Sequence, residues 1–183
     1  MKRALGVVVT SLLLGLFSLS TPSFAASFAA PRTLRVDYYH TGNSHEEWFS
    51  LDRVVLEPLE WPGNPNKASD ESQLGNYLFE VRERDSGKLV YSRGFNSVFG
   101  EWQTTEEALH GNRTFSESLR FPSPEAPVEV SLKERAGSGF REVWKTVVNP
   151  KDKFVDRSRP PSPGALMELQ KMGDPATLSL IHI

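Results

Sequence analysis

Apolar side chains recur at every second position through most of the chain after residue 32, and this spacing constrains the fold more than any other feature. In TLRVDYYH, residues 33–40, Leu34, Val36 and Tyr38 point to one face, while Arg35 and Asp37 point to the other. Period two is the spacing of a β-strand that buries one face. The stretch predicts a half-buried strand, and FSLDRVVLEPL, residues 49–59, predicts a second.

A β-hairpin is predicted by NYLFEVRERDSGKLVYSRGF, residues 76–95. Tyr77, Phe79 and Val81 alternate with polar partners, Asp-Ser-Gly at residues 85–87 forms the turn, and Leu89 and Tyr91 begin the return strand. RTFSESLRF, residues 113–121, and PVEVSLKERAGSGFREVWKTVV, residues 127–148, repeat the same alternation. Six or more strands are therefore expected.

The order of these elements predicts an all-β fold. Only TTEEALHG, residues 104–111, has a helical pattern, with Thr104 or Thr105 as N-cap and Gly111 as the stop. Many short alternating strands without a βαβ rhythm favour two packed antiparallel sheets, a β-sandwich. A half-open barrel is the alternative.

The amino-acid composition changes after Pro150. KDKFVDRSRPPSPGA is polar and rich in proline, offers no alternating face to bury, and is typical of a linker. ALMELQKMG, residues 165–173, then predicts a short helix of about two turns. We assign residues 26–150 to the sandwich domain and residues 151–177 to the linker, and we expect residues 32–150 to fold alone.

The first 25 residues are expected to be a signal peptide. A basic start, MKR, precedes an apolar core and the small residues Ser23 and Ala25, which a signal peptidase recognises. The apolar run is shorter than the about 20 residues that span a bilayer. We therefore expect an exported protein, periplasmic or extracellular, whose mature chain has no membrane anchor.

Composition excludes several kinds of chemistry. The sequence has no cysteine, which excludes disulfides, thiolate zinc ligands, cysteine catalysis and a lipoprotein anchor. Without Lys2 and Arg3, 19 basic and 23 acidic side chains remain, with both signs interspersed. This charge balance gives no indication of a nucleic-acid partner.

No catalytic or metal site can be assigned from the residues. HEEWF, residues 45–49, begins like the zinc-protease motif His-Glu-x-x-His, but its fifth position is Phe49, and its surroundings predict a loop. The other histidines, at positions 40, 110 and 182, lack ligand partners at metal spacing. The carboxylate pairs at positions 46–47 and 106–107 point to different faces and are interpreted as solvated charge.

Four tryptophans remain as candidates for binding. Trp102 and Trp144 are expected in the core, because large aromatic side chains dominate core burial. Trp48 and Trp61, if exposed, would stack against sugar rings and favour a binding module. If these two indoles are buried and a single apolar patch lies near the linker, a partner within the same polypeptide is favoured.

Five stretches resemble, in order, the N-terminal domain of the bacterial IgA-peptidase family of zinc metallopeptidases, metallopeptidase family sixty-four. They are TLRVDYYHTGN, FSLDRVVLEPLEWPGNP, LGNYLFEVRERDSGKLVYSRGFNSVFGEWQTT, RTFSESLRFPSPEAPVEVSLKER and FREVWKTVVNP. The resemblance covers about residues 33–150. It implies a non-catalytic β-sandwich placed ahead of a zinc protease domain, and its catalytic His-Glu-x-x-His signature has no counterpart here.

The last residues suggest that the chain is truncated before that catalytic domain. MGDPAT resembles the lead-in to the second domain, and LSLIHI follows. This hexapeptide is the translation of CTG TCT CTT ATA CAC ATC, which resembles a transposase adapter used for sequencing libraries. We expect residues 178–183 to be an adapter scar and zinc to belong to the missing domain.

Two functions follow as hypotheses. The first is an accessory domain of an exported zinc metallopeptidase, which positions a protein or glycan substrate or packs on its own protease domain. The second is a free-standing exported module that binds carbohydrate or protein.

Overall fold

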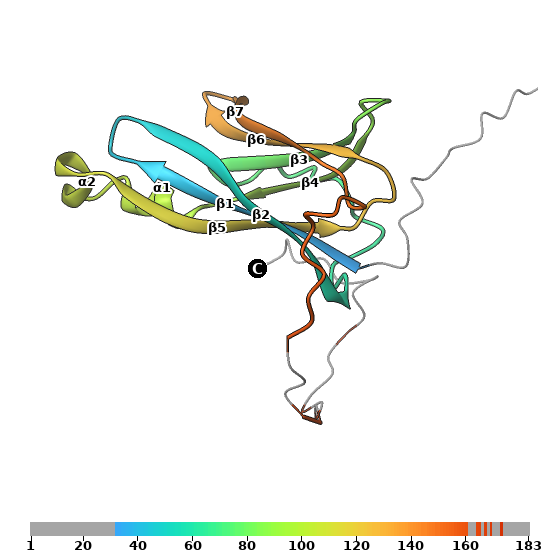
Figure 1. Cartoon of the computed structure of the whole chain (residues 1–183). Helices are drawn as coiled ribbons and strands as arrows, with labels where there is room; N and C mark the ends of the chain where they lie inside the picture. Colours follow the sequence, from blue (N-terminus) through green and yellow to red (C-terminus); the bar gives the residue numbers. More distant parts are fainter. Residues whose placement is uncertain (1–31, 161–163, 166, 168, 170–172, 174–183) are drawn as a thin grey trace, which may run out of the picture.

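The computed structural model describes residues 32–160 together with residues 164, 165, 167, 169 and 173. Within this part the chain forms seven strands and two short helices (Figure 1). Their bounds are β1 Arg32–Gly42, β2 Glu47–Glu60, β3 Tyr77–Glu83, β4 Leu89–Phe95, α1 Val98–Trp102, α2 Glu106–His110, β5 Arg113–Pro122, β6 Val128–Ala136 and β7 Gly139–Val148. The predicted signal peptide, residues 1–25, and residues 174–183 lie outside the described residues.

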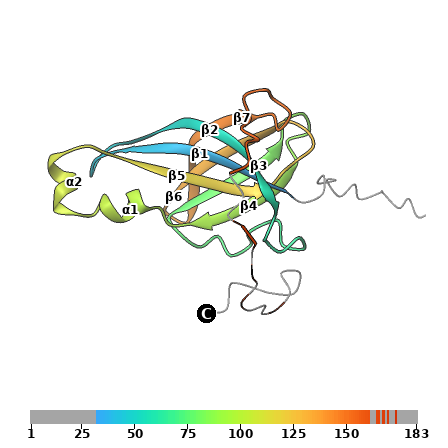
Figure 2. The ribbon, with the colours of Figure 1, turned by 60° about the horizontal axis from the view of Figure 1, so that its bottom comes forward.

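The strands form two antiparallel sheets that face each other (Figures 1 and 2). One sheet has the order β2-β1-β5 and the other the order β4-β3-β6-β7. The pairs β1–β2, β3–β4 and β6–β7 are hairpins, while β5 returns to pair with β1 from Thr33–Pro122 to Gly42–Arg113 without a register shift. The all-β sandwich is confirmed, and the half-open barrel is wrong because the strands form two separate sheets.

The core lies between the sheets and is built from the residues whose alternation predicted it. Leu34, Val36 and Tyr38 are at most 1% exposed, as their period of two indicates. Each such side chain stabilises the fold by about 1.5–3 kcal/mol relative to its exposed state. The fully buried core residues on the other strands of the two sheets are Val81, Leu119, Phe121, Val128, Val130 and Leu132.

Two short helices lie together at one end of the sandwich (Figures 1 and 2). The predicted helix is α2, which begins after Thr105 and ends before Gly111, although Thr105 makes no side-chain capping bond. The other, α1, was not predicted. Ser97 caps it by accepting a hydrogen bond from the Gly100 N–H at 2.8 Å, and it buries Phe99 and Trp102. Tertiary packing decides such short helices, because isolated ones are marginal in water.

The segment after Pro150 does not all behave as a linker. Val155 is only 6% exposed and belongs to the core. Asp156 forms a parallel bridge with Val55, with its N–H donating to Val54 O and its carbonyl accepting from Leu56 N–H, both at 2.8 Å. The prediction that residues 151–165 have nothing to bury is wrong at Val155, because the chain turns back against β2 before it leaves the domain.

The short helix predicted over residues 165–173 is not seen where it can be tested. Ala165, Met167 and Leu169 are described and are not helical. Met167 and Leu169 are 79% and 86% exposed, so these two side chains do not pack on the sandwich. Two turns without tertiary contacts do not form a stable helix in water. The other residues of this prediction lie outside the described part.

Candidate functional site

His45 lies in the four-residue loop between β1 and β2, as the sequence predicts. The Asn43 side chain holds this loop, because its Oδ1 accepts hydrogen bonds from the backbone N–H groups of His45 at 2.8 Å and Glu46 at 3.0 Å. Asn43 N–H in turn donates to Glu46 O at 2.9 Å. HEEWF therefore forms a turn leading into β2, and His45 and Phe49 are not on one helical face.

Glu47, the next carboxylate, is not solvated, and this corrects the expectation for the pair at positions 46–47. Its Oε2 accepts a hydrogen bond from Tyr77 OH at 2.7 Å and lies 2.9 Å from Nε2 of His40. On the other side of the same imidazole, Nδ1 of His40 lies 3.3 Å from Oε2 of Glu117, which accepts from Tyr38 OH at 2.8 Å. We name these five residues the His40 cluster.

Aromatic rings enclose the His40 imidazole. Its centroid lies 3.8 Å from that of Phe99, with nearly parallel planes, and 4.2 Å from that of Phe49. His40 is fully buried. Four strands and α1 therefore meet at this one side chain: His40 and Tyr38 come from β1, and the rest come from β2, β3, β5 and α1.

The contacts of the cluster favour a charged imidazole. An ionised carboxylate only accepts hydrogen bonds, and a doubly protonated ring can donate to both glutamates, whereas a neutral ring can donate to one. Burial lowers the pKa of His40, but the bonds and charges of Glu117 and Glu47 raise it more, so that it lies above the ordinary 6.5. Burial raises the pKa of Glu117, and the bonds from His40 and Tyr38 lower it below 4.5. The cluster is a buried ion pair.

The hydroxyl groups of the cluster are fixed as donors. Burial and the neighbouring carboxylates raise the pKa of Tyr38 and of Tyr77 above the ordinary value of 10. Both hydroxyls therefore keep their protons at physiological pH. One acceptor is left over, because Oε1 of Glu47 is buried and has no hydrogen-bond partner among the described residues.

These residues do not fit a zinc site. Both nitrogens of His40 already face carboxylates, and its two faces are covered by rings, so no coordination position is open. Among the described residues, no group of three or more His, Cys, Asp or Glu side chains is arranged so that it could hold a metal ion. His45 is exposed in the loop between β1 and β2, and His110 is exposed at the end of α2. His182 lies outside the described residues.

The second predicted carboxylate pair is solvated, as expected. Glu106 and Glu107 lie in the first turn of α2 and are exposed. Glu107 contacts Arg113 at 3.2 Å, with 64% and 51% of the two side chains exposed. Such an ion pair contributes little, about 0–1 kcal/mol.

Three of the four tryptophans lie in the core or pack against it, and the fourth is exposed. Trp102 is buried, and Trp144 packs on the core with its ring stacked on Tyr38 at a centroid distance of 5.8 Å. Trp61 also packs against the core, edge-on to Tyr91. Trp48 alone is exposed, at 45% of its surface. The core prediction for Trp102 is confirmed, whereas Trp144 is only partly buried against the core, and two exposed indoles do not occur.

The outer face of the sheet β2-β1-β5 carries a second charged group, which we name the outer ladder. Asp37 accepts from Arg35 at 2.8 Å, from Arg53 at 2.9 Å and from Ser118 at 2.6 Å. Glu57 pairs with Arg35 and with Arg120. Because these partners cover Asp37, β1 is buried at this point on both faces and not on one.

An apolar groove of about 410 Å³ lies where β2 and β7 approach each other. Leu51 and Val147, which line it, are 43% and 50% exposed, and Phe154 at its end is 81% exposed. Its other lining residues are Asp52, Arg53, Val54, Val148, Asn149, Asp152 and Val155. The groove therefore lies beside the segment by which the chain leaves the sandwich.

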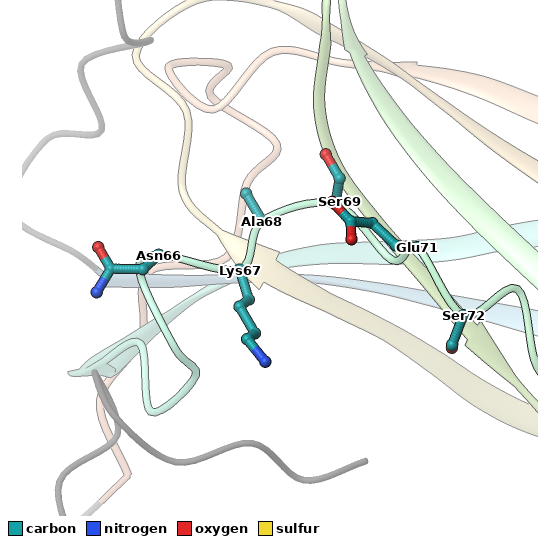
Figure 3. A pocket seen from close by; sticks show the side chains of 6 residues that line it. All are labelled: Asn66, Lys67, Ala68, Ser69, Glu71 and Ser72. Atoms are coloured by element: carbon teal, nitrogen blue, oxygen red, sulfur yellow. The ribbon is translucent and has the colours of Figure 1, made fainter.

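A further depression of about 460 Å³ lies in the loop between β2 and β3 (Figure 3). It is lined by Asn66, Lys67, Ala68, Ser69, Glu71 and Ser72. Figure 3 shows that these side chains spread apart and do not converge on one point. A ligand site needs convergent polar groups, so this depression supports no site.

The alternation of the strands contains a signal for the His40 cluster, because it places His40 and Glu117 in the inward phase. His40 continues the inward series of Leu34, Val36 and Tyr38, and Glu117 lies two residues from both Phe115 and Leu119, in the inward phase of β5. A polar residue in a buried phase needs a partner. Its identity depends on strand register, which joins positions 77 residues apart.

Comparison with known proteins agrees with the resemblance seen in the sequence. Residues 24–145 match the family model described as Peptidase M64 N-terminus. A search of curated proteins gives no match. In the described part of the chain, neither helix has the length and apolar character needed to cross a bilayer. The matched region covers more than half of the chain and nearly all of the sandwich, and the chain belongs to the peptidase M64 N-terminus family.

Proposed function

We propose that this chain is the non-catalytic N-terminal domain of an exported zinc metallopeptidase and that it packs on the protease domain of the same polypeptide through the β2–β7 groove. The family match supports a peptidase N-terminus. The one observation that carries the proposed contact is the position of the groove, which includes Asp152, Phe154 and Val155 just before the chain leaves the sandwich.

The apolar surface of the groove suits an intramolecular partner. Phe154, 81% exposed, and Val147, 50% exposed, stand beside Leu51 at 43%. Exposed apolar groups that gather in one place mark interaction sites, whereas single ones are common on any surface. A domain that follows in the chain is held near this groove by the linker, which raises its effective concentration there.

The contact can be tested in the polypeptide encoded by the source genome, including its downstream region. Phe154→Ser and Val147→Ser should lower the melting temperature of the protease region, with hydrogen exchange in residues 147–155 rising. The matched control is Leu109→Ser, which changes an exposed leucine on α2 outside the groove. Equal exchange of residues 147–155 with and without the downstream region would contradict the contact.

The absence of catalysis in this domain is a second part of the proposal. We expect purified residues 26–177 to show no zinc-dependent peptide cleavage, because a catalytic zinc needs three protein ligands and a bound water. Zinc belongs, in this proposal, to the protease domain. Cleavage of a protein substrate that disappears with a chelator and returns with zinc would contradict it.

Export rests on residues 1–25 and is proposed on the sequence alone. Edman sequencing of the protein recovered from the periplasm or the medium should begin close to residue 26. An intact Met1 on protein recovered from the cytoplasm would contradict export. The alternative function, a free-standing binding module, is supported by the exposure of Trp48.

A further inference from the structure

The outward phase of β1, β2 and β5 near the β1–β2 turn carries aromatic and hydroxyl side chains and no charge. The register aligns them in two rows across the sheet, Trp48–Thr41–Thr114 and Ser50–Tyr39–Ser116. We name these six residues the aromatic platform. They lie on the opposite side of the sheet from the His40 cluster, because neighbouring residues along a strand point to opposite faces.

The two rings of the platform are open to solvent. Trp48 is 45% exposed and Tyr39 is 40% exposed. They lie diagonally across adjacent strands, at a spacing of about 7–8 Å between backbones. In the described part of the chain neither ring packs on another aromatic ring. Their register partners in the two rows are short serine and threonine side chains.

Two of the four hydroxyl groups around the rings are held by a bond to each other. Oγ1 of Thr41 and Oγ1 of Thr114 are hydrogen-bonded at 3.0 Å across the strand pair. One of these hydroxyls uses its donor in that bond, and the other keeps its donor for a ligand. Ser50 and Ser116 flank Tyr39 and are exposed.

The outer ladder borders the platform on the next row of the sheet. Arg53 donates from Nε to Asp37, and its side chain is 57% exposed. Its remaining N–H groups are directed by a fixed ion pair, which reduces the entropy lost when they bind a ligand. The ladder places three guanidinium groups against two carboxylates, so the border carries little net charge for an anionic ligand to recognise.

We infer that the aromatic platform binds a neutral oligosaccharide, by stacking sugar rings on Trp48 and Tyr39. A pyranose ring has an apolar C–H face that suits the face of an aromatic ring, and a rim of hydroxyls that suits serine, threonine and guanidinium groups. A protein partner is disfavoured, because interface cores are apolar and well packed, while this face is rich in hydroxyls. This inference does not depend on the β2–β7 groove.

The test uses the full chain and a panel of soluble tetrasaccharides built from glucose, galactose, mannose or N-acetylglucosamine. Binding is measured by calorimetry and by tryptophan emission, which Trp48 reports because it is the exposed indole. At least one tetrasaccharide should bind, Trp48→Ala and Tyr39→Ala should each weaken that binding by about tenfold, and Trp48→Phe should retain most of it. Leu51→Ala in the groove and Leu109→Ala on α2 are matched controls and should bind as the unchanged chain does.

Each variant is first checked by thermal unfolding, and these exposed positions should leave stability nearly unchanged. The inference would be overturned if the unchanged chain bound none of the tetrasaccharides more tightly than the Trp48→Ala, Tyr39→Ala double variant does. A second arm uses a glycoprotein before and after enzymatic removal of its sugars. Platform-dependent binding that survives deglycosylation would assign the platform to a protein partner and would also overturn the inference.

Discussion

The sheet β2-β1-β5 carries a pair of carboxylates on each face, and the two pairs are stabilised differently. On the inner face Glu47 and Glu117 flank His40 among aromatic rings. On the outer face Asp37 and Glu57 are bound by Arg35, Arg53 and Arg120, two of which are more than half exposed. The same three strands thus hold one ion pair in an apolar interior and another at the water boundary.

The partners explain the difference. An arginine stays charged at every pH at which a protein is folded. Its planar guanidinium presents several N–H donors, so it can bind a carboxylate that also has other partners near the surface. A histidine loses its charge near neutral pH, and then two buried carboxylates face a ring with only one hydrogen to donate. We conclude that the outer ladder is insensitive to pH above the acid range, whereas the His40 cluster depends on the protonation of one residue.

The largest effect is expected from breaking the inner pair. Glu117→Leu leaves His40, Tyr38 OH and the Phe99 N–H without their acceptor. Removing one partner of a buried ion pair costs about 3–5 kcal/mol. Urea unfolding should show a loss in this range, with a smaller loss for Glu117→Gln, which keeps acceptor and shape. A loss below about 1 kcal/mol for Glu117→Leu would show that the cluster is not a strong ion pair.

The second prediction concerns pH. Because the pKa of His40 is raised, its stabilisation is complete below 6.5 and is lost as the pH rises through the folded pKa. Because the pKa of Glu117 is lowered, its stabilisation is complete above 4.5 and is lost as the pH falls through the folded pKa. The cluster should therefore contribute most between pH 4.5 and 6.5. The free energy of unfolding of the unchanged chain should decline above this window.

His40→Gln is the control for that decline, because glutamine cannot titrate. In this variant the fall in unfolding free energy between pH 6.5 and 9 should be smaller than in the unchanged chain. The groups that face His40 are Glu47, Glu117, Tyr38 and Tyr77, and both tyrosines keep their protons in this range. An identical alkaline decline in both proteins would assign it to another group.

A smaller effect is expected on the outer face. Asp37→Asn removes charge-assisted bonds from Arg35, Arg53 and Ser118, but Arg35 retains Glu57 and the guanidinium groups reach water. The loss should be about 2 kcal/mol. Burial raises the pKa of Asp37 and the bonds from Arg35, Ser118 and Arg53 lower it, so that it lies below 3.8. The variant should show less acid destabilisation and an unchanged alkaline limb; a changed alkaline limb would mean that the two faces are coupled.

The smallest effect should come from an ion pair whose two side chains both lie mostly in solvent. Arg113→Ala breaks the contact with Glu107, in which both side chains are more than half exposed. Chemical unfolding should register a change of less than about 1 kcal/mol, reduced further by salt. A larger change would point to the stacking of Arg113 on Phe115, at 5.2 Å, and Arg113→Lys would separate the two contributions.

Periodicity made the strands and much of the core predictable, because inward residues such as Leu34, Val36 and Tyr38 recur at every second position. It did not predict α1, whose five residues include Gly100 and whose stability comes from burying Phe99 and Trp102. Nor did it reveal the role of Glu47, because a carboxylate beside Glu46 gives no sign of burial until the register places Tyr77 and His40 around it. Local pattern determines which face a residue occupies, and long-range register determines its partner.

The return of the chain onto β2 has a consequence for how the domain behaves in isolation. Asp156 occupies the backbone N–H of Leu56 and the carbonyl of Val54, which lie in the run Val54-Val55-Leu56. Unpaired edge strands with β-branched apolar side chains recruit other chains and aggregate. A protein cut at residue 150 would keep most of its core but lose this cover, so self-association rather than unfolding is the failure expected of it.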